Sequence, residues 1–183
     1  MIQKRIETML SADATAVRQL KLVRDIGPKG AFIAAGFIRN RVWDAIYARS
    51  LPPLHADVDI VYFCKTDVSP ERDYAFEKHL NDADGSTDWQ VRNQARMHVF
   101  HGYPPFTSLE QGLMHWAETA TSVGVQLDEQ GEMHFVAPFG FNDLAHHILC
   151  ITPAMKEMDP AGFNARLEAK GWLKRWPRLR VVR

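Results

Sequence analysis

The chain has 183 residues, of which 46% are hydrophobic, and its 22 Lys and Arg residues balance 22 Asp and Glu residues. This length allows one ordinary domain with a buried core. Its only two cysteines, Cys64 and Cys150, lie far apart in the sequence, which excludes a disulfide scaffold and indicates a reducing compartment. The N-terminus lacks the apolar core of a signal peptide, and the longest apolar run, 31–38, is too short to span a membrane. We therefore expect a cytoplasmic protein with no membrane contact.

The zero net charge hides a segregation along the chain. Residues 97–155 contain six acidic residues and no Lys or Arg, whereas 156–183 contain eight basic residues against three acidic ones. The basic segment can dock against the acidic middle. Alternatively it can bind the phosphates of a nucleic acid, because its cations alternate with Trp172 and Trp176, which are also suited to anchoring a chain end. We expect a single domain over 1–183, with an N-terminal helical segment over 1–28 and a basic C-terminal helical segment over 156–183.

Local patterns in the first half predict helices that alternate with short strands. Ser11 or Asp13 can cap a helix that Gly27 and Pro28 end. A short buried run is closed by Gly36, which indicates a strand, a glycine turn and a helix in succession. The predicted elements are a helix over 14–25, a strand over 31–35, a helix over 39–49, an extended connection at Pro52-Pro53, a strand over 58–63 and a helix over 70–80.

The second half predicts further strands and helices without any internal repeat. The predicted elements are a strand over 89–99, a helix over 107–117, a hairpin of 122–127 with 133–136, a short helix that begins at 142 or 143 and runs toward 150, and a helix over 160–176. The order indicates an α+β fold with a mixed or antiparallel sheet flanked by helices. The strands over 31–35, 58–63 and 89–97 are expected to be neighbours, with the helix that follows Gly36 packed on one face.

The residues that suggest chemistry lie between Gly36 and Asp59. A glycine at the end of a strand lets the amides of the following helix approach an anion, and the helix start is positive. Asp57 and Asp59 are separated by one residue on a strand, so they project from the same face and can share a divalent cation. Together these features predict a triphosphate and a metal ion side by side, which is what metal-assisted phosphoryl transfer requires.

Five motifs follow one another along the chain: Ala-Gly-Phe-Ile-Arg-Asn-Arg-Val-Trp-Asp at 35–44, Asp-Val-Asp-Ile-Val-Tyr-Phe at 57–63, Trp-Gln-Val-Arg-Asn-Gln-Ala-Arg-Met-His at 89–98, Trp-Ala-Glu-Thr-Ala-Thr at 116–121 and Ala-Pro-Phe-Gly-Phe-Asn-Asp-Leu at 137–144. In this order they resemble a family of bacterial predicted nucleotidyltransferases in the DNA polymerase beta-like superfamily. Gly36 to Asn40 is also similar to the glycine-led signature of CCA-adding enzymes and poly(A) polymerases.

The resemblance implies an enzyme that transfers a nucleoside monophosphate from a nucleoside triphosphate to a hydroxyl group of an unknown acceptor. It implies that Asp57 and Asp59 hold Mg²⁺ or Mn²⁺, and that a third carboxylate on a neighbouring strand completes the catalytic set. Asp88 is the best placed candidate for that third acid, with Asp84 behind it. The nucleotide would be bound by Gly36, Phe37, Arg39 and Asn40, and by Arg92 and Arg96 from the sheet.

Three departures from the family pattern keep a second interpretation open. Phe37 occupies a position that is usually small, Cys64 stands where an aspartate is expected, and Asn93 is neutral. The alternative is a catalytically degenerate module of the same fold that binds a nucleotide or a protein. Likewise, Arg92 and Arg96, which would share a face of a strand over 89–99, can bind triphosphate or pair with Asp57, Asp59 or Asp88.

Other polar residues are interpreted as structural. The eight histidines include no pair at a zinc-binding spacing. Glu118, Thr119 and Thr121 lie where a helix gives way to a strand, a position at which side chains usually cap the backbone.

Overall fold

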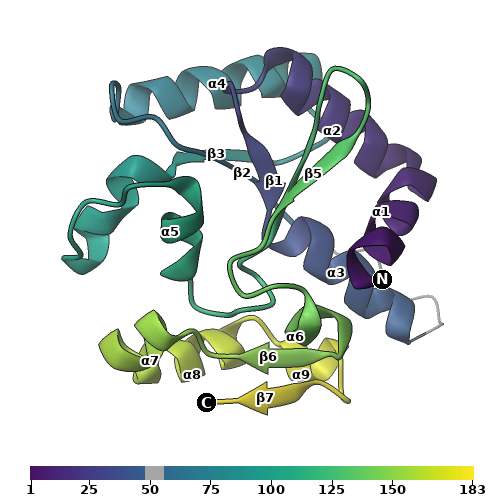
Figure 1. Cartoon of the computed structure of the whole chain (residues 1–183), viewed down its shortest axis with the longest axis vertical. Helices are drawn as coiled ribbons and strands as arrows, with labels where there is room; N and C mark the ends of the chain where they lie inside the picture. The colour runs from purple at the N-terminus through teal and green to yellow at the C-terminus, as the bar shows by residue number, and fades with distance from the viewer. Residues whose placement is uncertain (48–55) are drawn as a thin grey trace.

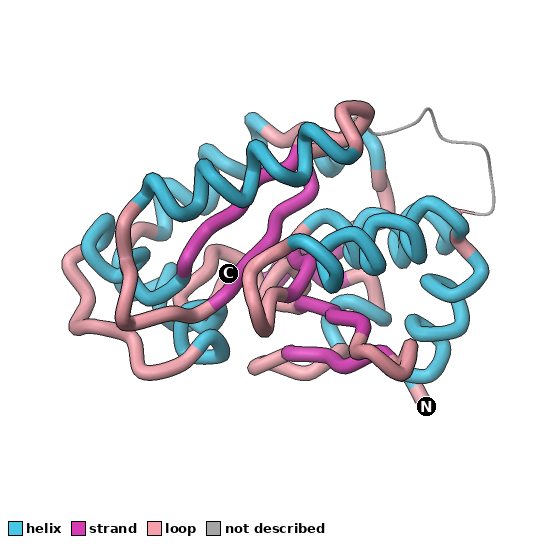
Figure 2. Tube along the Cα trace, turned by 90° about the horizontal axis from the view of Figure 1, so that it is seen from above, coloured by secondary structure: helices cyan, strands magenta, loops and turns pink. Residues whose placement is uncertain are grey.

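The computed structural model describes residues 1–47 and 56–183. The predicted connection at Pro52-Pro53 and the predicted end of the preceding helix at Arg49 lie outside the described residues. Figure 1 shows the main sheet above a layer of C-terminal elements, and Figure 2 shows helices flanking the strands. The chain therefore has the mixed α and β architecture that the sequence predicts.

The main sheet has five strands in the order β3-β2-β1-β4-β5. β2 and β3 are parallel, and the other neighbouring pairs are antiparallel. The three strands expected to be adjacent are adjacent, and the predicted hairpin is β4 with β5. The bounds are β1 Phe32–Ala34, β2 Val58–Tyr62, β3 Trp89–Asn93, β4 Gly124–Leu127 and β5 Met133–Val136.

Alternate residues of the strands face two different layers of helix. Ile33, Ile60 and Val91 face the main core, to which α1 (Ile2–Ala12), α2 (Ala14–Ile26) and α4 (Pro70–Ala83) contribute buried residues such as Leu10, Leu20 and Leu80. Ala34 and Val61 face the other way and pack with Leu113 of α5 (Leu109–Met114) in a smaller cluster. Because the side-chain period of a strand is two, Asp57 and Asp59 share the α5 face with Val61.

The C-terminal elements form a second layer around a small parallel sheet of two strands. β6 (Ile148–Cys150) pairs with β7 (Arg180–Val182), and neither strand was predicted. The predicted helix over 160–176 is instead two helices, because Gly171 adopts a left-handed conformation with φ of 61° between them. The helices of this layer are α6 Asn142–Ala145, α7 Pro153–Met158, α8 Pro160–Ala169 and α9 Trp172–Arg175.

The third predicted strand is shorter than expected. β3 ends at Asn93, and Gln94–His101 form a 3-10 helix, η1. The Asn93 side chain accepts a hydrogen bond from the Ala95 amide and so caps this helix. The prediction of a strand over 89–99 was therefore wrong in its second half, because a capping residue ends the strand.

Within the described ranges, no helix is long and apolar enough to cross a membrane.

Candidate active site

A turn at the end of β1 places the start of α3 (Gly36–Ile46) beside the sheet. Ala35 makes this turn with φ of 54° and ψ of −122° and donates its amide to the carbonyl of Val123. A Cβ at Gly36 would lie 3.0 Å from Nδ2 of Asn40 and 3.4 Å from Nη2 of Arg39. Glycine thus leaves room for these two side chains close to the helix start, and a larger residue would have to displace them slightly.

Phe37 does not fill this turn with its ring. The side chain is only 3% exposed and belongs to the main core, and the Arg41 guanidinium lies 4.2 Å from its ring centroid. Arg41 in turn is held by Asp13, at 2.7 Å, and by the Phe37 carbonyl, at 2.8 Å. The large residue at this position is therefore accommodated in the core.

The paired aspartates lie at the beginning of β2, opposite the end of β1. Ile33 pairs with Ile60 in the antiparallel register, so the next pair along is Ala34 with Asp59. The same geometry brings Gly36 near Asp57, and both residues line one cavity of about 420 Å³. The sequence prediction that the glycine turn and the aspartates adjoin each other agrees with this geometry.

Asp88 lies on the neighbouring strand, next to Asp57. Its carbonyl accepts a 2.8 Å hydrogen bond from the Val58 amide, at the point where β2 and β3 begin to run in parallel. The residue is exposed, whereas Asp84 behind it bonds Arg18, Ser86 and Thr87. Of the two acids, Asp88 is the one placed beside the paired aspartates.

Asp59 carries the clearest electrostatic signature of the site. Burial and the neighbouring Asp57 carboxylate raise its pKa to about 6, while Arg39, Lys170 and Arg166 act in the opposite direction. The repulsion between two close carboxylates is relieved when a cation binds between them. The two ionised aspartates are therefore more stable with a cation bound between them than without one.

The donor set also fits a hard divalent cation. Carboxylate oxygens are the ligands that Mg²⁺ prefers, and Mg²⁺ is usually held by one or two carboxylates together with substrate phosphates and water. Over residues 1–47 and 56–183, no three His, Cys, Asp or Glu side chains gather into a metal-binding group. The site therefore offers two aspartates, and substrate oxygens and water would supply the other ligands of the cation.

Arg39 connects the glycine turn to the C-terminal layer. Its guanidinium donates to Thr121 Oγ1 at 3.1 Å and to Asn40 Oδ1 at 2.9 and 3.2 Å, and lies 4.5 Å from the ring centroid of Trp172. The side chain is 6% exposed, and burial lowers its pKa to about 10, so it remains a cation at neutral pH. It provides a fixed positive charge near both aspartates.

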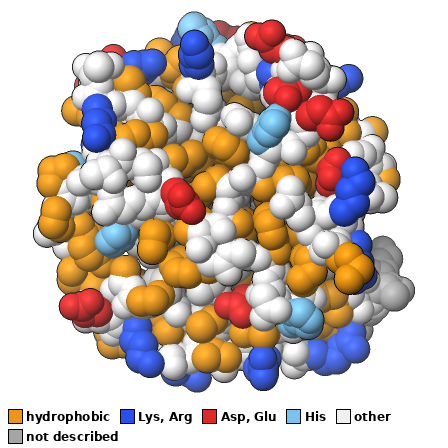
Figure 3. All heavy atoms as spheres, viewed as in Figure 1, with side chains coloured by type: hydrophobic (Ala, Val, Ile, Leu, Met, Phe, Trp, Pro, Cys, Tyr) orange, Lys and Arg blue, Asp and Glu red, His pale blue; other side chains and the backbone are white. Residues whose placement is uncertain are grey.

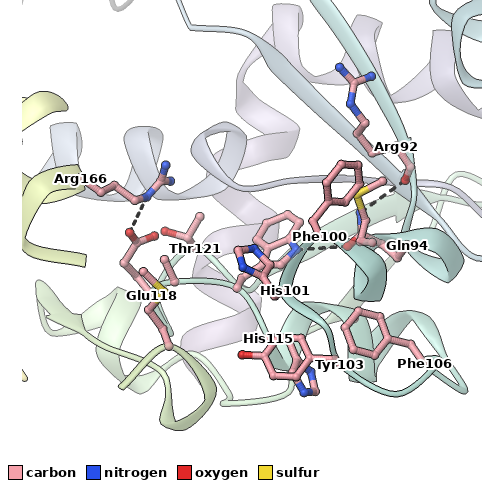
Figure 4. Close-up of a pocket in the computed structure, with 15 residues that line it drawn as sticks. Arg92, Gln94, Phe100, His101, Tyr103, Phe106, His115, Glu118, Thr121 and Arg166 are labelled. Atoms are coloured by element: carbon pink, nitrogen blue, oxygen red, sulfur yellow. Dashed lines mark hydrogen bonds and ion pairs between the residues drawn. The ribbon is translucent and has the colours of Figure 1, made fainter. Parts of the chain in front are cut away.

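Glu118 and Arg166 extend the site toward α8. Glu118 is 1% exposed and accepts a 2.6 Å hydrogen bond from Nε of Arg166 through one oxygen, while its other oxygen is buried without a partner. Both residues line a cavity of about 520 Å³ on the α5 face of the sheet, together with Thr121 and Arg92 (Figure 4). This buried carboxylate is thus part of a cavity wall. The interpretation of Glu118 as a backbone-capping residue does not account for that position.

Arg92 and Arg96 do not share a strand face, because only Arg92 lies on β3 and Arg96 belongs to η1. Arg92 pairs with Glu77 at 2.5 Å, and Arg96 pairs with the buried Asp73. The prediction of a shared strand was therefore wrong. Their ion-pair partners are carboxylates of α4 instead of Asp57, Asp59 or Asp88.

The basic C-terminal segment is docked by its tryptophans. Trp172 and Trp176 are buried, and Asp44 of α3 accepts hydrogen bonds from both Trp176 and Arg175. Lys and Arg side chains remain visible along the lower rim of the molecule, over the C-terminal elements (Figure 3). The anchoring interpretation accounts for the two tryptophans, and exposed cations such as Lys170 and Lys174 are left at the surface.

Comparison with known proteins agrees with this geometry. A family model described as nucleotidyltransferase matches residues 21–181. The chain belongs to this nucleotidyltransferase family. Among curated proteins, no sequence matches the chain.

Several solved structures have a fold similar to that of this chain. A structure reported as "The NMR structure of the protein reveals a CCA-adding enzyme head domain" is 27% identical, with a TM-score of 0.83 over 97% of this chain and 94% of that one. A CCA-adding enzyme complexed with CTP and the Thermotoga maritima enzyme complexed with tRNA are each 14% identical with a TM-score of 0.62. This chain covers 43% and 42% of those two chains, so it corresponds to less than half of their length.

Sequence reasoning missed part of the surroundings of this candidate site. Glu118 and Thr121 were interpreted as capping residues, and neither Arg166 nor Trp172 was placed near the aspartates. The signal that could have found them was the charge segregation, since an acidic middle without Lys or Arg needs cations from elsewhere in the chain. Arg166 with Glu118 is one such pair.

Proposed function

We propose that this protein transfers a nucleoside monophosphate from a nucleoside triphosphate to a hydroxyl group of an acceptor, with Mg²⁺ or Mn²⁺ held by Asp57 and Asp59. The observation that carries the proposal is the position of the two aspartates opposite the Gly36 turn, combined with the raised pKa of Asp59. A metal ion bound there would neutralise phosphate charge as the nucleotidyl group moves.

Several residues of the chain would each contribute to binding the triphosphate. The amides at the start of α3, left accessible by Gly36, suit phosphate oxygens, and Arg39 adds a buried positive charge. Asn40 orients Arg39 through its side-chain oxygen. Phe37 supports the turn from the core. Arg92 and Arg96 would contribute at most from a distance, because both are paired with carboxylates of α4.

The transfer also needs a group that accepts the proton of the acceptor hydroxyl. Asp88 is our candidate, since it lies beside Asp57 at the start of the adjacent strand and is exposed to an incoming substrate. The acceptor is not identified by these residues. Exposed cations of the C-terminal layer would suit one that carries phosphate, such as a nucleic acid.

A binding module without catalytic turnover is the second candidate. It is favoured by the observation that, in the described parts of the chain, no third metal-ligating side chain joins Asp57 and Asp59. Such a module would bind nucleotide with the same turn and aspartates but would not transfer it.

Nucleotide binding is tested first by thermal denaturation with Mg²⁺ or Mn²⁺ and each of the four ribonucleoside triphosphates. Ligand at about a hundred times its dissociation constant should stabilise the fold by roughly 2.7 kcal/mol. The double variant Asp57→Asn, Asp59→Asn should lose this stabilisation, whereas Asp82→Asn, on the exposed end of α4, should keep it. An equal response from the double variant would contradict the proposal.

Transfer is tested next with triphosphate labelled at the α-phosphate and a cell extract as the source of acceptor. Label should move to an acceptor with the wild type, and Asp59→Asn should abolish this movement. If nucleotide binding persists but label never leaves the triphosphate, the binding module is the correct function.

A further inference from the structure

Two cavities of different character lie near β2, the strand that carries Asp59. The first, of about 420 Å³, is lined by Gly36, Asn40 and Asp57 and carries polar residues of α2 such as Gln19. The second, of about 520 Å³, is lined by Arg92, whose register partner Val61 lies two residues after Asp59 on the same strand face. A transfer reaction needs two substrates at one set of carboxylates, and the first cavity contains the glycine turn assigned above to the triphosphate.

The second cavity has an aromatic wall on the side opposite Glu118 (Figure 4). The His115 ring contacts both Tyr103 and Phe106, with ring centroids 4.4 and 4.6 Å away, and these three rings lie together in Figure 4. Trp116 and Phe100 also line the cavity. Such a wall offers flat apolar faces on which a planar ring can stack.

Hydrogen bonds hold the rings of this wall in place before any ligand arrives. Nδ1 of His115 bonds the Gln111 carbonyl at 2.8 Å, and the Trp116 indole donates to Gln94 Oε1 at 3.2 Å. Gly112 permits this packing, because a Cβ there would lie 3.0 Å from Cβ of Gln94. A wall fixed in this way costs a ligand little ordering.

The opposite end of the cavity has an acceptor for a hydrogen bond that the protein leaves unused. Glu118 is 1% exposed, and its Oε2 is the one buried side-chain atom without a partner among the described residues that line this cavity. Thr121, close by, accepts a hydrogen bond from Arg39, and Arg166 donates to the other oxygen of Glu118. A buried carboxylate oxygen without a donor is costly, and a ligand N–H or O–H would satisfy it.

We propose that this cavity binds the acceptor substrate through a planar aromatic ring that presents an N–H or O–H donor to Glu118. The ring stacks on the wall formed by His115, Tyr103 and Trp116, and the donor on its edge bonds the free oxygen of Glu118. The assignment of this ring to the acceptor rests on the proposed function. The binding of an aromatic ring in this cavity does not depend on whether the protein transfers nucleotides.

The test uses indole as the probe and benzofuran as its isostere without an N–H. Protein NMR follows the indole N–H signal of Trp116, assigned with Trp116→Phe, in the absence of metal and nucleotide. Millimolar indole should shift this signal, and benzofuran should bind about tenfold more weakly, because it cannot donate to a charged oxygen. The absence of a shift, or equal affinities for the two compounds, would overturn the proposal whether or not the protein transfers nucleotides.

Two variants and a matched control locate the binding. Glu118→Gln keeps the shape but can place an amide donor where the ligand donor would lie, so indole should lose its advantage over benzofuran. Phe100→Ala removes a wall residue that is 68% exposed and should weaken both probes without loss of folding. The control is Val99→Ala on the same 3-10 helix, outside the cavity lining, which should change neither affinity. Unchanged binding in both cavity variants would refute the site.

The assignment to the acceptor is tested by adding a non-hydrolysable triphosphate with Mg²⁺ at saturation. Indole should bind together with the triphosphate, which is the result expected if the two cavities hold different substrates. Displacement of indole by the triphosphate would mean that the ring belongs to the donor nucleotide, and would overturn the assignment to the acceptor.

Discussion

At the scale of single residues, Asp59 shows the energetic cost of a buried carboxylate beside a second one. Its pKa of about 6 means that the folded protein holds a proton more readily than the unfolded chain, in which an ordinary aspartate has a value near 3.8. The unfavourable contribution is therefore complete above pH 6 and disappears as the pH falls toward 4. The residue therefore lowers stability at neutral pH, and a cation bound between the two carboxylates would offset this cost.

Asp59→Asn should accordingly stabilise the protein at pH 7 in the absence of metal. We expect a gain of about 1–2 kcal/mol in the free energy of unfolding, measured with urea, because the variant removes a partly buried charge next to Asp57. The gain should vanish near pH 4. Asp82→Asn, at an exposed ion pair, should change stability by less than about 0.5 kcal/mol. A loss of stability in Asp59→Asn at pH 7 would contradict the electrostatic account.

In contrast to Asp59, a substitution of Gly36 should affect the affinity for triphosphate more than the free energy of unfolding. In Gly36→Ala, the new Cβ meets Asn40 Nδ2 at 3.0 Å and displaces the side chains that orient Arg39. Affinity for triphosphate with Mg²⁺ should fall about tenfold or more. Stability should change by less than about 1 kcal/mol, since alanine favours the helix. Gly85→Ala, which meets only one ordinary contact, is the control, and calorimetry measures both affinities.

At the scale of elements, one ion-pair network joins α3 to α9. Asp44 accepts hydrogen bonds from Arg175 Nε at 3.1 Å, from Arg175 Nη2 at 2.6 Å and from the Trp176 indole at 2.8 Å. The Trp176 ring also lies edge-on to Trp43, with centroids 5.0 Å apart. The Asp44 carboxylate is therefore one of several contacts that hold the helix of the glycine turn against the C-terminal layer, beside the tryptophan pair and the hydrogen bonds of Arg178 to Ile46 and Tyr47.

Asp44→Ala should lower the free energy of unfolding by about 2 kcal/mol, because it leaves partly buried donors without their charged acceptor. Urea denaturation measures this loss, and limited proteolysis should show faster cleavage after Arg175 as α9 detaches. Asp25→Ala breaks an exposed pair with Arg24 and should cost less than about 0.5 kcal/mol. Equal losses in the two variants would argue against the role of Asp44 as the link.

Some elements of the fold can be predicted from the local sequence pattern, and others cannot. β2 was predictable because a β-branched and aromatic run leaves no helical alternative. β6 and β7 have three residues each and are stable only because they pair with each other across some thirty residues, which no local pattern reveals. The same limit applies to the site: Gly36, Asp57 and Asp59 carry a spacing signal, whereas Glu118 and Arg166 meet only after the chain has folded.

At the scale of the whole molecule, the main core includes residues from both ends of the chain. Ile6 and Leu10 of α1 and Trp172, Trp176 and Leu179 of the C-terminal segment all belong to it. The C-terminal segment is thus a part of the core as well as a basic surface.

A chain truncated after Lys170 should consequently fail to fold cooperatively. Loss of one buried tryptophan costs about 3–5 kcal/mol, so loss of two approaches the whole stability of a typical domain. Far-UV and near-UV circular dichroism with urea titration would show a weak or absent transition. Removal of Arg183 alone, whose hydrogen bonds to Asn164 and Lys156 are exposed, should leave the transition almost unchanged. A stable fold in the truncated chain would show that the tryptophans are dispensable.

The contact between Arg39 and Trp172 also bears on the order in which the protein is made. Synthesis proceeds from the N-terminus, so the glycine turn leaves the ribosome while the residues that cover Arg39 are still untranslated. Until Trp172 arrives, this guanidinium lacks one of the surfaces that hold it. The nascent chain would therefore carry its aspartates and its turn before Trp172 covers Arg39, and the candidate site would be complete only after the C-terminal layer has been made and has docked.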